Sequence, residues 1–217
     1  MEERTPVDDQ EKSVLAKKGQ EALDKLYSSA LNGIPMVSCA VDDLVEDYLS
    51  KYETVEEAAA ALVRSQVMKC GTSGFITGFG GFITLPVMIP ANVSSVFYVQ
   101  MRMIAAIAAM GGYDVRSDQV KTLVYVCLTG TSIADLLKEA GVKVGEQVTR
   151  AAIKKIPGAV LTKINQRIGF RFITKFGEKG VVNLGKCVPL VGAVIGGGMD
   201  VASTRVIGKR AIAEFIA

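Results

Sequence analysis

The sequence predicts an all-α protein, a compact multi-helix bundle that contains a Gly/Pro-rich apolar helical hairpin. Apolar residues recur at helical spacing along most of the 217 residues, and helix start and stop signals separate these stretches. The composition also suits close helix packing, because 49% of the residues are hydrophobic but only 6% are aromatic. A chain of this length with this apolar content can bury one sizeable core, so we expect a single domain.

The N-terminal part is predicted to start with a flexible stretch and to continue as two acidic helices. Residues 1–13 are charged and have no apolar stretch, which indicates a flexible N-terminus without a secretory signal. Helical spacing predicts a first helix over about 9–31, which Asn32-Gly33 ends, and a second helix over about 37–52. We therefore expect acidic helices over 14–53, within a single helical domain that extends over 14–217.

The middle of the chain is predicted to form a capped helix followed by the apolar hairpin. Thr54 to Glu57 has the form of a capping box, which starts a helix that continues to about Cys70. The next 31 residues, 71–101, carry no charge and are longer than a bilayer-spanning helix needs. Five glycines and two prolines interrupt them, so we expect two helical arms, the second starting at Pro90 or Asn92 and ending at Gly111-Gly112.

The C-terminal half is predicted to be a series of helices separated by Gly and Pro. Ser117 can cap a helix that extends to Leu128, and the following segments end at Gly141 and before Pro157. The predicted helices lie over about 117–128, 132–140, 146–156, 159–176 and from 189 to the C-terminus.

Charge is distributed unevenly along the chain. Residues 1–57 contain 14 acidic and 6 basic residues, whereas residues 58–217 contain 8 acidic and 19 basic ones, so the two parts carry net charges of −8 and +11. The basic part favours an anionic partner, either a membrane surface or a nucleic acid, unless the two parts neutralise each other. No helix-turn-helix signature, aromatic platform or arginine-rich arm supports nucleic acid, so we expect no nucleic-acid partner.

The predicted membrane-binding residues lie on a basic helix and on the hairpin. Four bases recur at every fourth residue of the predicted helix over 159–176 and form a stripe that suits anionic membrane lipid. The stripe could instead be solvated or could dock on the acidic N-terminal helices. The residues assigned to membrane binding are Lys163, Arg167, Arg171 and Lys175 on the helix and Phe79, Phe82, Pro86 and Pro90 on the hairpin.

Polar residues inside apolar stretches form the other candidate site. A buried charge needs a partner, so we expect Arg102 or Arg205 to pair with a nearby aspartate inside the bundle. The predicted buried polar network consists of Gln100, Arg102, Asp114, Asp135, Asp200 and Arg205. Its three aspartates, Asp114, Asp135 and Asp200, are the only weak catalytic candidates. The chain has no histidine, and its four cysteines have no metal-ligand spacing, so we expect buried thiols and neither a metal nor a cofactor.

Three segments together resemble the EcsC family. They are GFGGFITLPVMIP (78–90), QMRMIAAIAAMGGYD (100–114) and VPLVGAVIGGGMDVASTRVIGKRAI (188–212), and the resemblance covers about residues 54–214, the family-like core. It implies a bacterial helical protein without implying a reaction. The pattern is also more weakly similar to the membrane-associated helical domain appended to some bacterial GTPases, although this chain has no phosphate-binding loop.

These observations together predict a non-enzymatic accessory protein, cytoplasmic and peripheral on the inner face of the cell membrane. It would bind anionic lipid through the basic helix and the apolar hairpin, and a membrane transporter or a GTPase is a candidate protein partner. The first alternative is an enzyme or carrier that handles a lipid or another apolar ligand with the buried carboxylates. The second alternative is a pore-forming or membrane-disrupting effector. The oligomeric state is left open.

Overall fold

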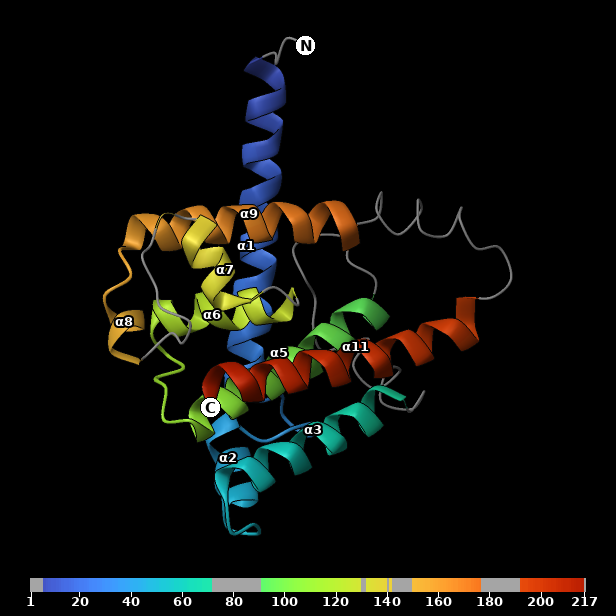
Figure 1. The fold of residues 1–217 in the computed structure, drawn as a ribbon. Coiled ribbons are helices and arrows are strands. Elements are labelled where there is room, and N and C mark those ends of the chain that lie inside the picture. Colours follow the sequence, from blue (N-terminus) through green and yellow to red (C-terminus); the bar gives the residue numbers. More distant parts are fainter. Residues whose placement is uncertain are drawn as a thin grey trace.

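The computed structural model describes residues 6–71, 91–129, 132–139, 141, 150–176 and 192–216. Figure 1 shows that these residues form helices that cross one another in several directions. No β-strand occurs in this part of the chain, so the predicted all-α class is confirmed. The helices are α1 (Pro6–Asn32), α2 (Val41–Leu49), α3 (Val55–Gly71), α5 (Ala91–Met110), α6 (Asp118–Leu128), α7 (Ile133–Glu139), α8 (Arg150–Lys154), α9 (Gly158–Phe176) and α11 (Gly192–Phe215).

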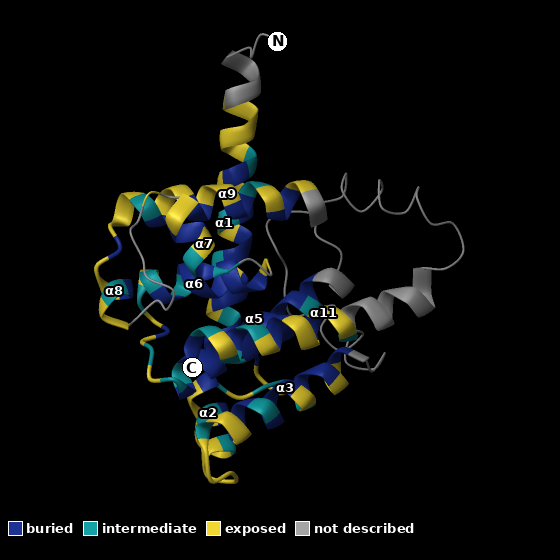
Figure 2. Ribbon diagram, in the orientation of Figure 1, coloured by how far each residue is buried: buried dark blue, intermediate teal, exposed yellow. Residues whose placement is uncertain are grey.

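Helix α5 lies at the centre of the bundle. From Ser94 to Met110 only Val96 and Ala109 are even partly exposed, and the helix is dark along most of its length in Figure 2. It packs against α1, α2, α3, α6 and α11. A helix that is apolar on all sides is stable only when other elements surround it, which explains the scarcity of charges between residues 94 and 110.

Two close helix contacts depend on glycine. Helix α9 crosses α1 where Gly169 meets Gly19, and a Cβ atom on Gly19 would lie 2.0 Å from the carbonyl oxygen of Gly169. Helix α11 packs along α3 at Gly208, where a Cβ atom would lie 2.7 Å from Cγ1 of Val63. Larger residues at these positions would keep the helices apart, so the glycines fix how closely the four helices pack.

Helix boundaries largely follow the predicted signals. The Thr54 hydroxyl accepts a hydrogen bond from the Glu57 amide at 3.2 Å, and the Ser117 hydroxyl accepts one from the Val120 amide at 3.4 Å. Gly33 and Gly112 have φ values of 77° and 76°, so each adopts the left-handed conformation within two residues of the end of a helix. These local signals confirm the predicted starts of α3 and α6 and the predicted ends of α1 and α5.

Two helix starts differ from the prediction. Helix α1 begins at Pro6, which suits the first position of a helix, so residues 6–13 of the predicted flexible stretch are helical. Helix α2 begins at Val41 instead of residue 37, because the chain turns at Met36, whose φ is 63°. The hydroxyl groups of Ser38 and Tyr98, 2.6 Å apart, hold this turn against α5. Most of the predicted hairpin, residues 72–90, lies outside the described residues.

Candidate membrane-binding surface

Helix α9 has one apolar side and one basic side. Leu161, Ile164, Ile168 and Phe172 are buried, and the Phe172 ring meets the Phe97 ring edge-on with 4.9 Å between centroids. The helix packs against α1 and α6, so its apolar side belongs to the core of the bundle. This side is therefore not available to enter a bilayer, and only the opposite side of α9 faces solvent.

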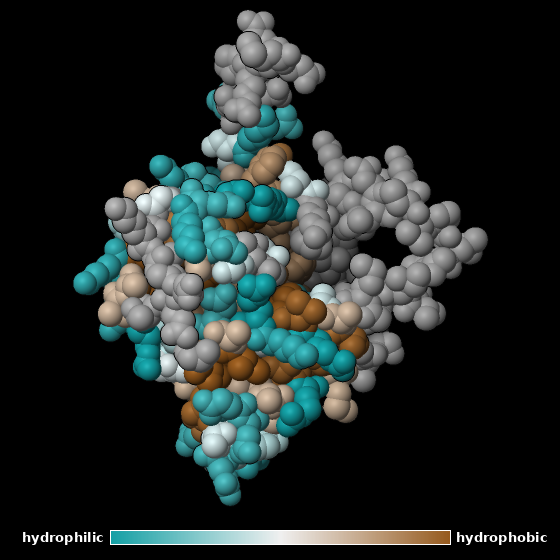
Figure 3. All heavy atoms as spheres, in the orientation of Figure 1, coloured by the Kyte–Doolittle hydropathy of each residue, from teal (hydrophilic) through white to brown (hydrophobic). Residues whose placement is uncertain are grey.

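The predicted basic stripe lies on that exposed side. Lys163, Arg167 and Arg171 are all exposed, whereas the side chain of Lys175 lies outside the described residues. Arg167 forms an exposed ion pair with Glu139 of α7. Lys163 and Arg171 form no ion pair with any residue that the structure describes. Figure 3 shows the α9 region as mostly hydrophilic surface.

The neighbouring helix α8 and the turn after it add positive charge. Lys154 and Lys155 are exposed at the corner between α8 and α9. Arg150, at the start of α8, places its guanidinium 5.6 Å from the ring centroid of Tyr113, in a cation–π contact. Residues 150–175 contain seven basic residues and no acidic one. We call the exposed side chains of Lys154, Lys155, Lys163, Arg167 and Arg171 the basic face.

The predicted hairpin lies mostly outside the described residues. Phe79, Phe82, Pro86 and Pro90 lie outside the described residues. The C-terminal end of the uncharged run is part of α5, where Phe97, Tyr98 and Met101 are buried in the core. In the described part of the chain no single helix is long and apolar enough to cross a membrane, although α6 and α7, bent by 108° at their junction, pass that test as a pair.

Arg102 is buried, as predicted, but its partners are different from those expected. One Nη1–H donates to the carbonyl oxygen of Ala30 at 3.0 Å, and Nη2–H groups donate to the carbonyl oxygen of Ala40 and the sulfur of Cys39, both at 3.3 Å. Ala30 is in the last turn of α1, where carbonyl groups lack helical partners and carry partial negative charge. Backbone carbonyls therefore compensate the guanidinium, and no described carboxylate pairs with it.

Three other charged members of the predicted network are not buried. Asp114, Asp135 and Arg205 are exposed, so their predicted burial is wrong, and the side chain of Asp200 lies outside the described residues. Asp114 accepts a hydrogen bond from the Arg116 amide at 3.0 Å in the turn before α6. Within the described residues no three side chains of the Cys, Asp and Glu types form a group that could hold a metal ion. Asp114 and Asp135 therefore belong to no such group.

Gln100 belongs to a polar contact that the sequence analysis did not predict. Its Nε2 donates to the hydroxyl oxygens of Ser203 at 3.2 Å and Thr204 at 3.0 Å, and the Thr204 hydroxyl donates to the Cys70 sulfur at 3.5 Å. These residues join α5, α11 and α3 inside the bundle. Gln100 therefore links α5 to α11 by hydrogen bonds to two hydroxyl groups.

The cysteines are less uniform than predicted. Cys70 and Cys127 are buried, but Cys39 is exposed in the turn before α2, and Cys187 lies outside the described residues. Burial raises the pKa of the Cys127 thiol from 9.0 to about 12, and Glu214 adds to this effect while Arg210 opposes it. A protonated thiol is a poor nucleophile, which argues against catalysis by Cys127.

Nearly the whole chain matches the model of one protein family. The family model of the EcsC protein family matches residues 20–215. The chain belongs to this family. No curated protein and no solved structure matches the chain. The weaker similarity to the helical domain of some bacterial GTPases is not supported by these comparisons.

The EcsC match places the candidate surface inside the family region. It begins in α1, at residue 20, and not near residue 54 as the sequence analysis predicted, so it includes α2 and most of α1. It ends at residue 215, the last residue of α11. The whole of α8 and α9, with the basic face, and the Arg102 contacts to Ala30 and Ala40 therefore belong to the EcsC region.

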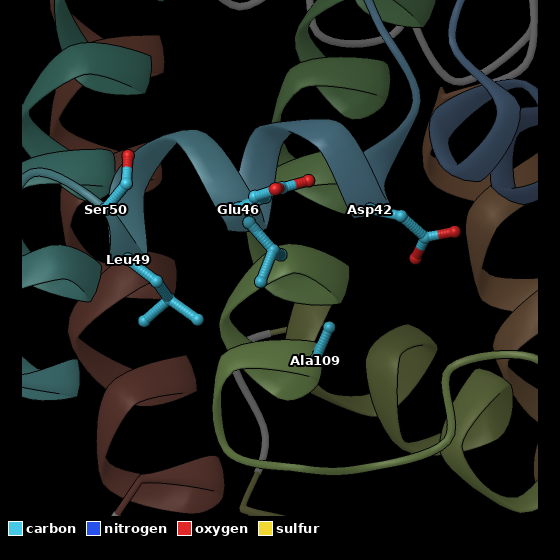
Figure 4. Close-up of a pocket in the computed structure, with 6 residues that line it drawn as sticks. Asp42, Glu46, Leu49, Ser50 and Ala109 are labelled. Atoms are coloured by element: carbon cyan, nitrogen blue, oxygen red, sulfur yellow. The ribbon is translucent and has the colours of Figure 1, made fainter.

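The α2 helix of the EcsC domain borders two shallow grooves. The first, of about 600 Å³, lies between α2 and the end of α5 and is lined by Asp42, Val45, Glu46, Leu49, Ser50 and Ala109. Figure 4 shows Leu49 pointing to the side of α2 on which Ala109 lies, whereas the carboxylates of Asp42 and Glu46 point elsewhere. Asp42 is paired with Arg116 at 2.7 Å, and both side chains are exposed. The second groove, of about 500 Å³, lies between α2 and α3.

Proposed function

We propose that this EcsC domain binds anionic membrane surfaces peripherally through the basic face, and that its role is accessory and not enzymatic. The observation that carries the proposal is the position of the bases on α9. Lys163, Arg167 and Arg171 are exposed together, while the apolar side of the same helix is buried in the core. A helix held in this way presents charge without having to unfold or leave the bundle.

The distribution of charge on the folded chain supports this proposal. Glu139 is the only acidic residue of the described chain that forms an ion pair with a residue of the basic face. A surface with five cations and a single paired carboxylate gains free energy when it approaches anionic lipid. Each basic residue near such a surface contributes roughly 1 kcal/mol, and salt weakens the effect.

The mode of attachment follows from the packing. Because the apolar side of α9 is occupied by the core, α9 binds through charge alone and does not insert. We therefore propose an attachment that is reversible and sensitive to salt, on the inner face of the cell membrane, where anionic lipids are exposed to cytoplasmic proteins. A membrane transporter or a GTPase remains a proposed protein partner.

Flotation of the full chain with lipid vesicles tests the proposal. The test variant replaces Lys163, Arg167 and Arg171 by Gln, and the control replaces Arg64, Arg205 and Lys209, three exposed cations of α3 and α11, by Gln. Both variants lower the net charge from +3 to 0. We expect the wild type and the control to float with anionic vesicles at low salt and not with neutral ones. Removal of three bases of the basic face should weaken binding by roughly 3 kcal/mol, about a hundredfold.

The control decides how a loss of binding is interpreted. Equal loss in both variants would show that net charge alone matters and would remove the basic face as the binding surface. Absence of flotation of the wild type with anionic vesicles at low salt would contradict the proposal altogether.

A further inference from the structure

The outer side of α2 carries a row of exposed carboxylates. Asp42, Asp43, Glu46 and Asp47 are all exposed, while the buried residues of this helix lie on its opposite side. Asp42 and Asp47 have exposed cationic partners within the chain. Asp43 and Glu46 form no ion pair with any residue that the structure describes. The fold therefore presents negative charge on α2 that it does not use for its own stability.

The groove between α2 and the end of α5 adds apolar surface to these carboxylates. Its lining includes Asp42 and Glu46 together with Val45, Leu49 and Ala109. Leu49 is 39% exposed, and in Figure 4 the two carboxylates point away from it, so charged and apolar atoms occupy different parts of this surface. Lys and Arg pack their aliphatic stems on apolar surface while their charged ends reach polar partners. The surface therefore suits basic side chains with long stems.

The same chain has a surface of the opposite charge, the basic face. Its bases on α9 recur at every fourth residue, a rise of about 6 Å along the helix for each step. The carboxylates of α2 recur at the same interval, as the pairs Asp42–Glu46 and Asp43–Asp47. Two helices that lie side by side with the same charge spacing can form several ion pairs at once, as helices of a coiled coil do along their flanks. The two surfaces therefore match in both sign and spacing.

We propose that the acidic side of α2 binds the basic face of a second copy of this chain. Helices α2 and α9 lie towards opposite ends of the bundle in Figure 1, so one copy cannot bring its own two surfaces together. The contact is therefore head-to-tail, and its repetition yields short linear chains or rings instead of a two-fold dimer. Exposed charges supply most of the attraction, so the association is weak and salt-sensitive.

The contact also bears on membrane binding, a consequence that rests on the proposed function. A second copy and anionic lipid would occupy the same basic face, so they compete for it. The competition matters only at protein concentrations high enough for the copies to associate. Dilute protein binds lipid as a monomer, and concentrated protein in the absence of membrane keeps its basic face covered.

Sedimentation velocity of the full chain across a concentration series, without lipid, measures the association. We expect self-association at low salt that decreases at high salt. The test variant carries Asp43→Asn and Glu46→Gln, and the control carries Glu11→Gln and Glu21→Gln, two exposed acids of α1. Both variants raise the net charge from +3 to +5. The α2 variant should associate about tenfold more weakly, whereas the control should associate like the wild type.

A mixing experiment tests the head-to-tail geometry. The α2 variant keeps its basic face, and a second variant, with Lys163, Arg167 and Arg171 replaced by Gln, keeps its acidic α2. Each should stay monomeric alone at concentrations where the wild type associates. Their mixture should form a one-to-one complex and no larger species, because each copy retains one of the two surfaces. All the replaced residues are exposed, so the thermal unfolding of both variants should match that of the wild type.

Three results would overturn the inference. One is a wild-type chain that stays monomeric at every concentration at low salt. Another is an equal loss of association in the α2 variant and its control, which would reduce the effect to net charge. The third is a mixture of the two variants that forms no complex, which would locate the contact elsewhere. Because these measurements use no lipid, their failure would not affect the proposed membrane binding, which flotation tests separately.

Discussion

The glycine crossing between α1 and α9 allows a sharp prediction about stability. A Cβ atom on Gly169 would lie 2.6 Å from the carbonyl oxygen of Ala16 and 2.8 Å from the amide nitrogen of Gln20. Ordinary contacts of a Cβ atom begin near 3.4 Å, so α9 would have to move away from α1 by about 0.8 Å. The clashing atoms belong to the backbone of α1, so no side chain can rotate to make room.

Two opposing effects set the magnitude for Gly169→Ala. Overpacking a well-packed contact costs about 1–3 kcal/mol, and Ala is favoured over Gly inside a helix by about 1 kcal/mol. We expect a net loss of up to about 2 kcal/mol in the free energy of unfolding, or up to about 8 °C in Tm for a chain of this size. Gly19→Ala should lose more, because its Cβ atom would lie only 2.0 Å from the Gly169 carbonyl oxygen.

Thermal and urea unfolding, monitored by circular dichroism, measures this loss, and Gly158→Ala is the matched control. Gly158 is at the first position of the same helix, and a Cβ atom there would meet nothing within 4 Å. The control should therefore be neutral or slightly stabilising. The double variant of Gly19 and Gly169 should lose less than the sum of the two single losses, because one separation of the helices relieves both clashes. If Gly169→Ala were as stable as Gly158→Ala, the close crossing of α1 and α9 would be wrong.

Two further predictions concern buried groups. Arg102→Met should lower the free energy of unfolding by about 2 kcal/mol in urea titrations, because hydrogen bonds from a charged group to Ala30 and Ala40 are lost. Unchanged stability would show that burying the cation costs as much free energy as these bonds contribute. Folding raises the pKa of the Cys127 thiol from 9.0 to about 12. Above pH 9 the unfolded chain therefore loses a proton that the folded chain keeps, and the free energy of unfolding falls as the pH rises from 9 to 11. Cys127→Ala should reduce this slope by about 1.4 kcal/mol per pH unit, and an identical slope in the two proteins would contradict the assignment.

Local signals in the sequence were sufficient for most helix boundaries. The hydroxyl of Ser117 caps α6, and Gly112 adopts the left-handed conformation after α5, because both effects depend on residues within one turn. The start of α2 was predicted four residues too early. The turn before it is held by Tyr98 and Arg102 of α5, more than 50 residues away along the chain. Such contacts cannot be recognised from local spacing.

The prediction of the buried polar network considered only side chains as partners for a buried arginine. A buried arginine needs compensation, and the sequence shows only side chains as possible partners. In the fold, the guanidinium of Arg102 donates to the backbone carbonyl oxygens of Ala30 and Ala40. Every residue has a backbone carbonyl, so the sequence does not show which of them will accept these hydrogen bonds. Asp114 and Asp135 were selected because charges are scarce around them, but both are exposed, Asp114 in the turn before α6 and Asp135 in the first turn of α7. Scarcity of charge identified Arg102 as a buried cation without predicting its partners.

The folded chain keeps its charges apart instead of neutralising them. Residues 42–57 contain seven acidic residues and one basic residue, and they form α2 and the start of α3. Residues 150–175 contain seven basic residues and no acidic one, and they form α8 and α9. Helices α9 and α2 lie towards opposite ends of the bundle in Figure 1, and no ion pair in the described residues joins the two groups. A chain selected only for stability would gain from bringing these charges together, so their separation favours binding partners of opposite charge at the two ends. Replacing Asp42, Asp43, Glu46 and Asp47 by neutral residues should therefore leave the affinity for anionic vesicles at low salt unchanged or slightly higher. A large rise in affinity would show instead that the negative charge of α2 weakens binding by the basic face.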